Sequence, residues 1–156
     1  MSQAKKLWKS LAKKPFGKVV FSQLVCQKAP YFRTIHPRFE TLEPGSCTVS
    51  MKKRRSVCNH LGTVHAIAMC NMAELAAGTM TDVTVPSSHR WIPKSMSVEY
   101  LKKATTDLKA TATLTESPKF TQDKEIAVVD VSIASSDQTV VMTAKIDMHI
   151  SPKTKR

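Results

Sequence analysis

The chain has 156 residues, 42% of them hydrophobic and 23% charged, which excludes a disordered or a membrane-embedded protein and fits one domain with a substantial core. Lysine and arginine number 24 against 12 acidic residues, and the net charge of +12 favours polyanionic partners: nucleic acid, anionic lipid or a phosphorylated ligand. No apolar run reaches the ~20 residues of a membrane span. Lysines interrupt the N-terminus before a signal-peptide core forms, so we expect a cytoplasmic protein.

The N-terminal segment, residues 1–30, is expected to be a helical extension. Apolar residues four apart within residues 3–14 predict an amphipathic helix that Pro15 and Gly17 break, and residues 18–29 predict a second helix. A basic amphipathic helix can lie on a membrane surface, but more often its apolar stripe packs on its own domain.

Residues 31–150 are expected to form the main domain, followed by a basic tail over 151–156. A strand is predicted over 35–41, a turn at Pro44-Gly45, and a second strand over 46–54, where apolar and polar residues alternate. The apolar stretch 64–78 predicts a helix that ends at Gly78.

A loop is expected over residues 80–94, and only strands after it. Alternation predicts strands that begin near Met96, Leu108 and Val140, and the apolar run 126–134 predicts a strand buried on both faces or nearly so. Short connections make these strands antiparallel, so the fold class is α+β. A helix that is apolar on nearly every side must be covered on nearly every side, which a strongly curved sheet wrapped around it would achieve.

One carboxylate, Glu74, interrupts the apolar helix. Burying an ionised carboxylate is costly unless it is paired, and no cation lies within one helical turn of it. A solvent-facing position or a salt bridge would explain Glu74 structurally. A general base or nucleophile in a dry pocket would explain it chemically. His65 lies nine residues earlier, about two and a half turns, so the two side chains face opposite sides of one helix. Either His65 acts at the helix start, or a second subunit brings the two together.

Asn59, Gly62, His65 and Glu74 match the pattern N-x-x-G-x-x-H-G-G followed by an acid nine residues after the histidine. This pattern resembles the phenylacetate-pathway branch of the hotdog-fold acyl-CoA thioesterases. The sequences NHLGTVHA and AELAAG are more similar still to those of an uncharacterised hotdog domain of unknown function. The resemblance spans about residues 29–150 by element order, and it implies a long central helix wrapped by a curved antiparallel sheet.

The resemblance also implies a reaction, the hydrolysis of an acyl-CoA thioester. Glu74 would be the general base or nucleophile, the backbone N–H of Ala66 would polarise the carbonyl oxygen, and Asn59 would place substrate or water. His65 completes the expected catalytic set, and Gly62 belongs to the expected substrate-binding set. Sites of this family are built across a dimer interface, which implies a homodimer or a dimer of dimers.

The expected ligand is an acyl-CoA, and no cofactor or metal is expected. Arg90, Lys102 and Lys103 are the candidates for binding the CoA phosphates. The glycines are too far apart for a nucleotide-binding loop, and the spacing of the cysteines and histidines matches no usual zinc site. The four cysteines form no C-x-x-C pair, and a cytosolic setting would keep them reduced. With 6% aromatic residues and no nucleic-acid motif, a specific nucleic-acid binder is not favoured.

The chain departs from the family pattern in ways that bear on turnover. Ala66 and Ile67 replace the two glycines of H-G-G. The family often has a Ser or Thr on the strand after the helix, and in this chain that position falls near Pro93, which has no hydroxyl. The alternative function is therefore a non-catalytic acyl-CoA or lipid-binding hotdog module. A hotdog dehydratase is a third option, but its histidine motif is not apparent.

Overall fold

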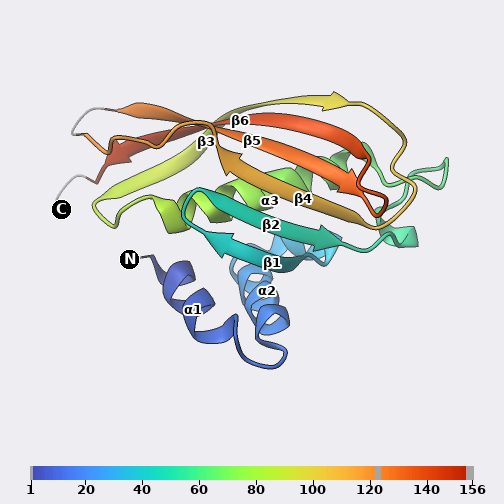
Figure 1. The fold of residues 1–156 in the computed structure, drawn as a ribbon, viewed down its shortest axis with the longest axis horizontal. Helices are drawn as coiled ribbons and strands as arrows, with labels where there is room; N and C mark the ends of the chain where they lie inside the picture. The colour runs from blue at the N-terminus through green and yellow to red at the C-terminus, as the bar shows by residue number, and fades with distance from the viewer. Residues whose placement is uncertain (1, 122–123, 154–156) are drawn as a thin grey trace.

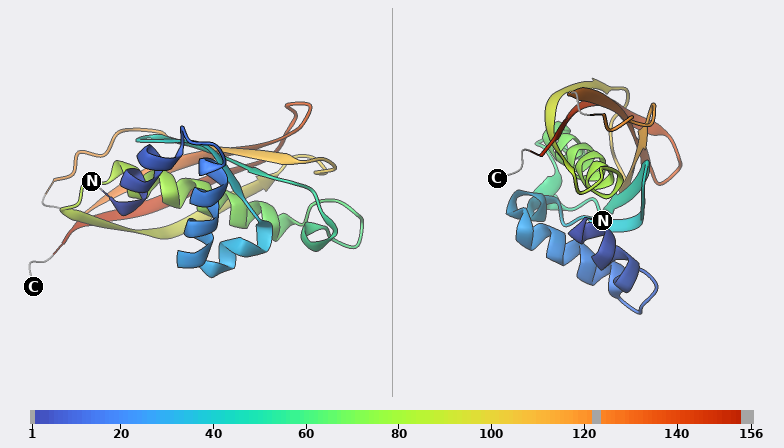
Figure 2. Two further views of the ribbon diagram at one scale, coloured as in Figure 1. Left: turned by 90° about the horizontal axis from the view of Figure 1, so that it is seen from below. Right: turned by 90° about the vertical axis from the view of Figure 1, so that its left-hand side faces the viewer.

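The computed structural model describes residues 2–121 and 124–153, in which a curved antiparallel sheet wraps one long helix (Figure 1). Seen along the helix, the sheet curls around it, and the N-terminal helices lie outside, across its open side (Figure 2). The elements in chain order are α1 (Gln3–Leu11), α2 (Gly17–Lys28), the 3₁₀ helix η1 (Pro30–Ile35), β1 (Arg38–Glu43), β2 (Ser46–Met51), the 3₁₀ helix η2 (Arg55–Val57), α3 (Ala66–Thr84), β3 (His89–Tyr100), β4 (Leu108–Leu114), β5 (Glu125–Ser135) and β6 (Val140–Pro152).

The six strands form one sheet in the order β1-β2-β4-β5-β6-β3, and every neighbouring pair is antiparallel. The predicted order of two strands, one apolar helix and four strands is confirmed. β1 and β3 are the two edges of the sheet, because β1 pairs only with β2 and β3 pairs only with β6 within the described residues.

The core lies between the concave face of the sheet and α3. Alternate residues of each central strand point inward, so Cys47, Val49 and Met51 of β2 are buried, as the alternation predicts. On α3, Met72, Leu75 and Met80 are fully enclosed. The prediction that residues 126–134 are buried on both faces or nearly so is wrong, because only alternate residues of β5 are buried and Ile126 is 44% exposed.

The central helix is longer than predicted, because α3 continues past Gly78 to Thr84 and β3 already begins at His89. The hydroxyl of Thr81 donates to the carbonyl of Ala77, so this polar side chain is satisfied within the helix itself. The predictions of a cap at Gly78 and a loop over 80–94 are therefore wrong.

The first strand begins at Arg38 rather than at residue 35, because residues 30–35 form a 3₁₀ helix that ends in the left-handed His36. The second strand ends at Met51 rather than at residue 54, before the four consecutive basic residues 52–55.

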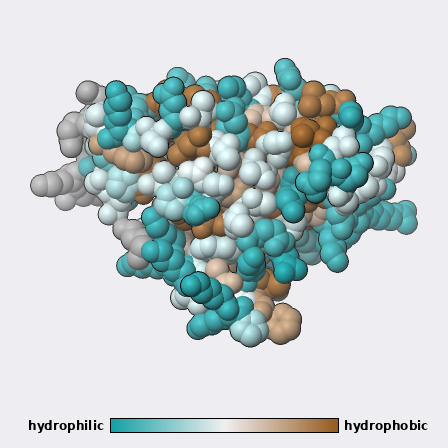
Figure 3. All heavy atoms as spheres, viewed as in Figure 1, coloured by the Kyte–Doolittle hydropathy of each residue, from teal (hydrophilic) through white to brown (hydrophobic). Residues whose placement is uncertain are grey.

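The N-terminal helices pack on the domain through a chain of aromatic rings. Trp8 of α1 contacts Phe21 of α2 edge to face, and Phe21 contacts Phe39 of β1 in the same way, each pair with ring centroids 5.0 Å apart. No helix within residues 2–121 and 124–153 is long and apolar enough to cross a membrane. The face shown in Figure 3 is mostly hydrophilic, with small apolar areas between the polar side chains. Of the predicted basic tail, residues 151–152 end β6, and residues 154–156 lie outside the described residues.

Candidate functional site

One face of α3 borders two hollows, of which one lies against α1, α2 and η1 and the other against η1 and η2. Ile67, Asn71, Glu74, Gly78 and Asp82 are spaced three or four residues apart, which places them along one face. The first two residues line a polar hollow at the helix start, and the other three line an apolar hollow further along. A candidate binding surface therefore follows the helix from its N-terminus to its last turns.

The apolar hollow has a volume of about 350 Å³ and is bordered by Glu74. Its walls come from α1, α2, η1, α3, β3 and β6, and include Val25, Phe32, Leu75, Trp91 and Met148. Glu74 is exposed, and the described part of the chain offers it no ion pair and no hydrogen bond. The carboxylate therefore faces solvent at the border of the hollow, which is the first of the two structural explanations, and it forms no salt bridge within the described residues. It does not lie in the dry pocket that the chemical explanation assumed.

The polar hollow, of about 220 Å³, lies where α3 begins and is bordered by Asn71. The Asn71 side chain is buried, and its Nδ2 donates to Thr34 Oγ1 at 3.1 Å. Its Oδ1 is also buried and has no hydrogen-bond partner among the described residues. A buried carbonyl oxygen without a donor is costly, but Oδ1 has almost no accessible surface, so a ligand would reach it only if neighbouring side chains moved.

His65 is the N-cap of α3 rather than a free side chain. Its Nδ1 accepts a hydrogen bond from the backbone N–H of Ile67 at 3.1 Å, which satisfies one of the donors left open at a helix start. The N–H of Ala66 has no hydrogen-bond partner among the described residues. It stands at the positive end of the helix dipole, where an oxyanion would be stabilised.

Asn59 and Gly62 shape the loop that leads into this helix start. Asn59 Oδ1 accepts from the backbone N–H groups of Leu61 at 3.0 Å and Thr63 at 3.2 Å, and its Nδ2 donates to Thr63 Oγ1 at 3.0 Å. Gly62 has φ of +73°, a conformation that favours glycine. The amide of Asn59 is thus engaged within its own loop.

The predicted phosphate-binding residues lie at opposite ends of α3. Lys102 and Lys103 are close to the helix start, since the N–H of Val64 donates to the carbonyl of the neighbouring Ala104 at 2.8 Å. Arg90 follows the end of the helix and donates from Nε to Ser151 Oγ at 3.1 Å. The 19 residues of α3 span roughly 28 Å, so the structure does not bring Arg90 together with the two lysines.

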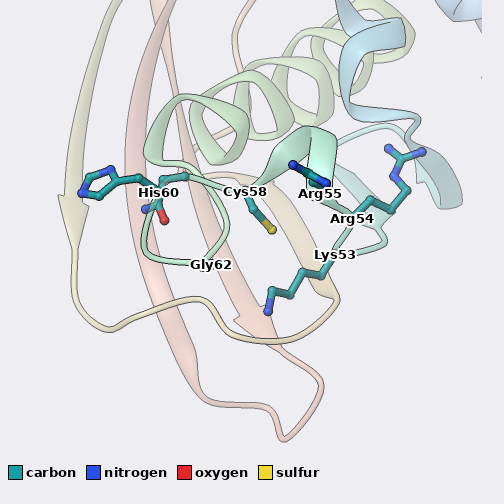
Figure 4. Close-up of a pocket in the computed structure, with 7 residues that line it drawn as sticks. Lys53, Arg54, Arg55, Cys58, His60 and Gly62 are labelled. Atoms are coloured by element: carbon teal, nitrogen blue, oxygen red, sulfur yellow. The ribbon is translucent and has the colours of Figure 1, made fainter.

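A third hollow, which the sequence did not assign to a site, lies beside Lys53 and Arg55 (Figure 4). The signal for it was the densest basic run in the chain, Lys52–Arg55. It opens next to the loop of Asn59 and Gly62.

One of the four thiols, that of Cys70, forms a hydrogen bond. Cys26, Cys47, Cys58 and Cys70 are all free, and burial raises the pKa of the Cys47 thiol. A hydrogen bond of 3.1 Å joins Cys70 Sγ to Tyr100 Oη. Within the described ranges, no three His, Cys, Asp or Glu side chains are grouped so that they could hold a metal ion.

Residues 17–150 match the family model Domain of unknown function (DUF4442). The chain belongs to this family. A structural-genomics protein of solved structure is 44% identical, with a TM-score of 0.81, and the match covers 96% of this chain and 98% of that one. No curated protein matches the chain.

Other solved structures share the fold at low identity. A thioesterase from Haemophilus influenzae is 12% identical, with a TM-score of 0.76, over 92% of this chain and 96% of that one. A mutant thioesterase from Pseudomonas aeruginosa is 17% identical, with a TM-score of 0.73, over 90% and 96%. These likenesses confirm the hotdog fold that the motif predicted.

Proposed function

We propose that this DUF4442 protein is a thioesterase that hydrolyses an acyl-CoA, with Glu74 as its general base or nucleophile. The observation that carries the proposal is the position of Glu74. Its carboxylate has no partner among the described residues, borders an apolar hollow, and lies on the helix whose first N–H, that of Ala66, also has no partner among them. The apolar walls suit an acyl chain. A carboxylate at their rim is placed to act on the thioester group at the end of that acyl chain.

In the general-base form of the reaction, Glu74 takes a proton from a water molecule whose oxygen attacks the thioester carbonyl carbon. The Ala66 N–H stabilises the negative charge that develops on the carbonyl oxygen. The C–S bond then breaks, the sulfur takes up the proton, and the products are a carboxylic acid and free CoA. His65 acts as a positioning residue, because its imidazole caps the helix end that presents the Ala66 N–H.

The spacing of two functional groups supports this assignment. Two solved structures of a Staphylococcus aureus protein, named a thioesterase in one of them, carry alanine in place of a glutamine and of a glutamate respectively, at positions fifteen residues apart. Asn59 and Glu74 are an amide and a carboxylate with the same separation.

A homodimer, or a dimer of dimers, completes the proposed site. Glu74 and Ala66 are eight residues apart on α3, about 12 Å along its axis, which is too far for both to act on one carbonyl group. The β3 edge pairs with β6 alone among the described residues, and it exposes Ile92 and Met96. An exposed edge strand has unpaired backbone groups with which a second copy can pair. Two-fold pairing along β3 would set α3 beside the α3 of the second copy. Glu74 of one copy and the Ala66 N–H of the other would then act on the same thioester.

A hydrolysis screen over a panel of acyl-CoA esters, read by release of free thiol, tests the proposal. Glu74→Gln keeps the shape of the side chain and removes the base, so turnover is expected to fall by at least ~10²-fold. The melting temperature should not change, because Glu74 is exposed and has no partner within the described residues. A Gln variant that hydrolyses acyl-CoA as fast as the parent would remove Glu74 from the mechanism.

The alternative is a module that binds acyl-CoA without hydrolysing it. The observation that favours it is Ile67, whose side chain stands 55% exposed at the helix start, where the family pattern has glycine. This side chain narrows the approach to the Ala66 N–H. Saturable binding of acyl-CoA with no thiol release over the whole panel would establish the binding module instead.

A further inference from the structure

The third hollow is basic and has no counter-charge in its wall. Its volume is about 660 Å³, and its lining consists of Lys53, Arg54, Arg55, Cys58, Asn59, His60 and Gly62. Neither Lys53 nor Arg55 forms an ion pair with any residue that the structure describes. Concave surfaces of one charge concentrate ligands of the opposite charge, so this hollow favours an anion.

The side chains around the hollow have different tasks. Lys53 and Cys58 extend toward the same open space between the end of β2 and the loop of Gly62, whereas Arg54 and His60 turn away from it (Figure 4). Arg54 instead donates from Nη2 to the carbonyl of Ile35 at 2.9 Å, which ties the basic segment to η1. An acidic residue, Asp107, does lie nearby, but it accepts from the backbone N–H of Lys53 at 2.8 Å and is not part of the lining.

We propose that this hollow binds the phosphates of the nucleotide end of CoA, with Lys53 and Arg55 as the cationic contacts. The proposal rests on acyl-CoA being the ligand of the proposed function. A guanidinium and an ammonium group supply several donors to phosphate oxygens without a competing carboxylate. Arg90, which lies beyond the other end of α3, has no part in this site.

The basic hollow and the polar hollow at the helix start share one lining residue. Cys58 lines both the basic hollow and the polar hollow that contains Asn71. A ligand with its phosphates at Lys53 can therefore extend past Cys58 toward the N-terminus of α3, as the pantetheine arm of CoA would.

A nucleic-acid strand fits this surface less well than a single phosphorylated molecule. Binding of single strands combines a basic groove along the backbone with aromatic side chains on which bases stack. The lining of the basic hollow has no Phe, Tyr or Trp. The lysine and arginine side chains of the lining also all come from one short segment, residues 53–55.

Calorimetric titration of the full chain with CoA, dephospho-CoA, adenosine 3′,5′-bisphosphate and pantetheine tests the proposal. Lys53→Gln and Arg55→Gln are each expected to weaken CoA binding about 10-fold, and the double variant about 10²-fold, with pantetheine binding unchanged. Lys53→Gln preserves the backbone bond to Asp107, so folding is retained. As a control, Lys9→Gln combined with Lys13→Gln also removes two positive charges, one in α1 and one just after it. This variant is expected to bind CoA within about 2-fold of the parent, since distant exposed charges are screened.

Kinetics with paired substrates separate this proposal from the proposed function. The double variant should raise KM for an acyl-CoA, keep kcat, and leave hydrolysis of the matching acyl-pantetheine unchanged. A parent that binds CoA without hydrolysing any ester, and loses that binding in the double variant, would retain the phosphate site and reject the thioesterase. A parent that hydrolyses acyl-CoA with a KM that neither substitution changes would retain the thioesterase and reject the phosphate site. A parent that binds no CoA, an equal loss in the α1 control, or tighter binding of a single-stranded oligonucleotide than of CoA would overturn the phosphate site.

Discussion

The indole ring of Trp91 lies against the α-carbon of Gly78. A Cβ at position 78 would stand 3.1 Å from Cη2 of the ring and 3.6 Å from Cζ3, closer than side chains normally approach. This contact explains why the central helix carries a glycine in its interior, where glycine otherwise costs about 1 kcal/mol relative to alanine. Both residues line the apolar hollow, so their contact forms part of its wall.

The Gly78 contact predicts a coupled effect of two substitutions. Gly78→Leu should lower the free energy of unfolding by about 1–3 kcal/mol, because the new side chain meets the Trp91 ring. In a Trp91→Ala background the leucine can occupy the vacated space, so its cost should fall by at least about 0.5 kcal/mol. Denaturant unfolding of the four proteins of this cycle measures the coupling. Strictly additive effects would contradict the contact.

The N-cap role of His65 predicts which replacement is tolerated. His65→Ala removes the acceptor for the Ile67 N–H and should cost about 1 kcal/mol of stability. Asparagine is a preferred N-cap, so His65→Asn should recover the stability together with most of the thioester turnover. Melting temperature and kcat are measured on the same proteins. A stable Asn variant without activity would show that the imidazole does more than position the helix end.

The pair of Cys70 and Tyr100 predicts a dependence of stability on alkaline pH. The hydrogen bond to Cys70, then burial, raises the pKa of Tyr100 to about 12. The folded state therefore holds this proton more tightly than the unfolded state. The resulting stabilisation is present in full below pH 10 and is lost as the pH rises toward 12.

Phenol absorbance isolates that titration in a Tyr31→Phe background, since the chain has two tyrosines. Cys70→Ala removes the hydrogen bond and should lower the pKa of Tyr100 toward 10. An unchanged titration curve in the Cys70→Ala protein would show that the thiol has no influence on the phenol.

The exposed edge of β3 predicts an effect of charge on assembly. Ile92→Lys combined with Met96→Lys should convert the assembly to a monomer, because lysines on an edge strand oppose pairing with another copy. Both side chains are exposed in the single chain, so its fold should be retained. The proposed composite site should lose its turnover at the same time.

Sedimentation velocity measures this change. Ile126→Lys is the control for each single substitution, since it places one lysine on an exposed apolar residue of β5, away from the edge, and should leave the assembly intact. A parent that is a stable monomer at micromolar concentration would contradict both the assembly and the composite site.

The sequence by itself determined the order of the elements and the inward face of the most regular strands. The alternation of Cys47, Val49 and Met51 is enough to orient β2, because successive side chains of a strand point to opposite faces. The resemblance of the motif around His65 and Glu74 to the hotdog thioesterases likewise implied the hotdog fold, because the residues that carry it lie within one short segment.

Only the tertiary structure decided which surfaces are covered and where α3 ends. The helix continues through Gly78 because Trp91, thirteen residues later, packs on it, and local glycine preference carries no information about such a contact. The exposure of Glu74 and Ile126 and the position of Lys53 beside a hollow likewise depend on elements that are distant in sequence. Periodicity records the orientation of side chains within one element, whereas burial depends on which other elements, distant in sequence, pack against it.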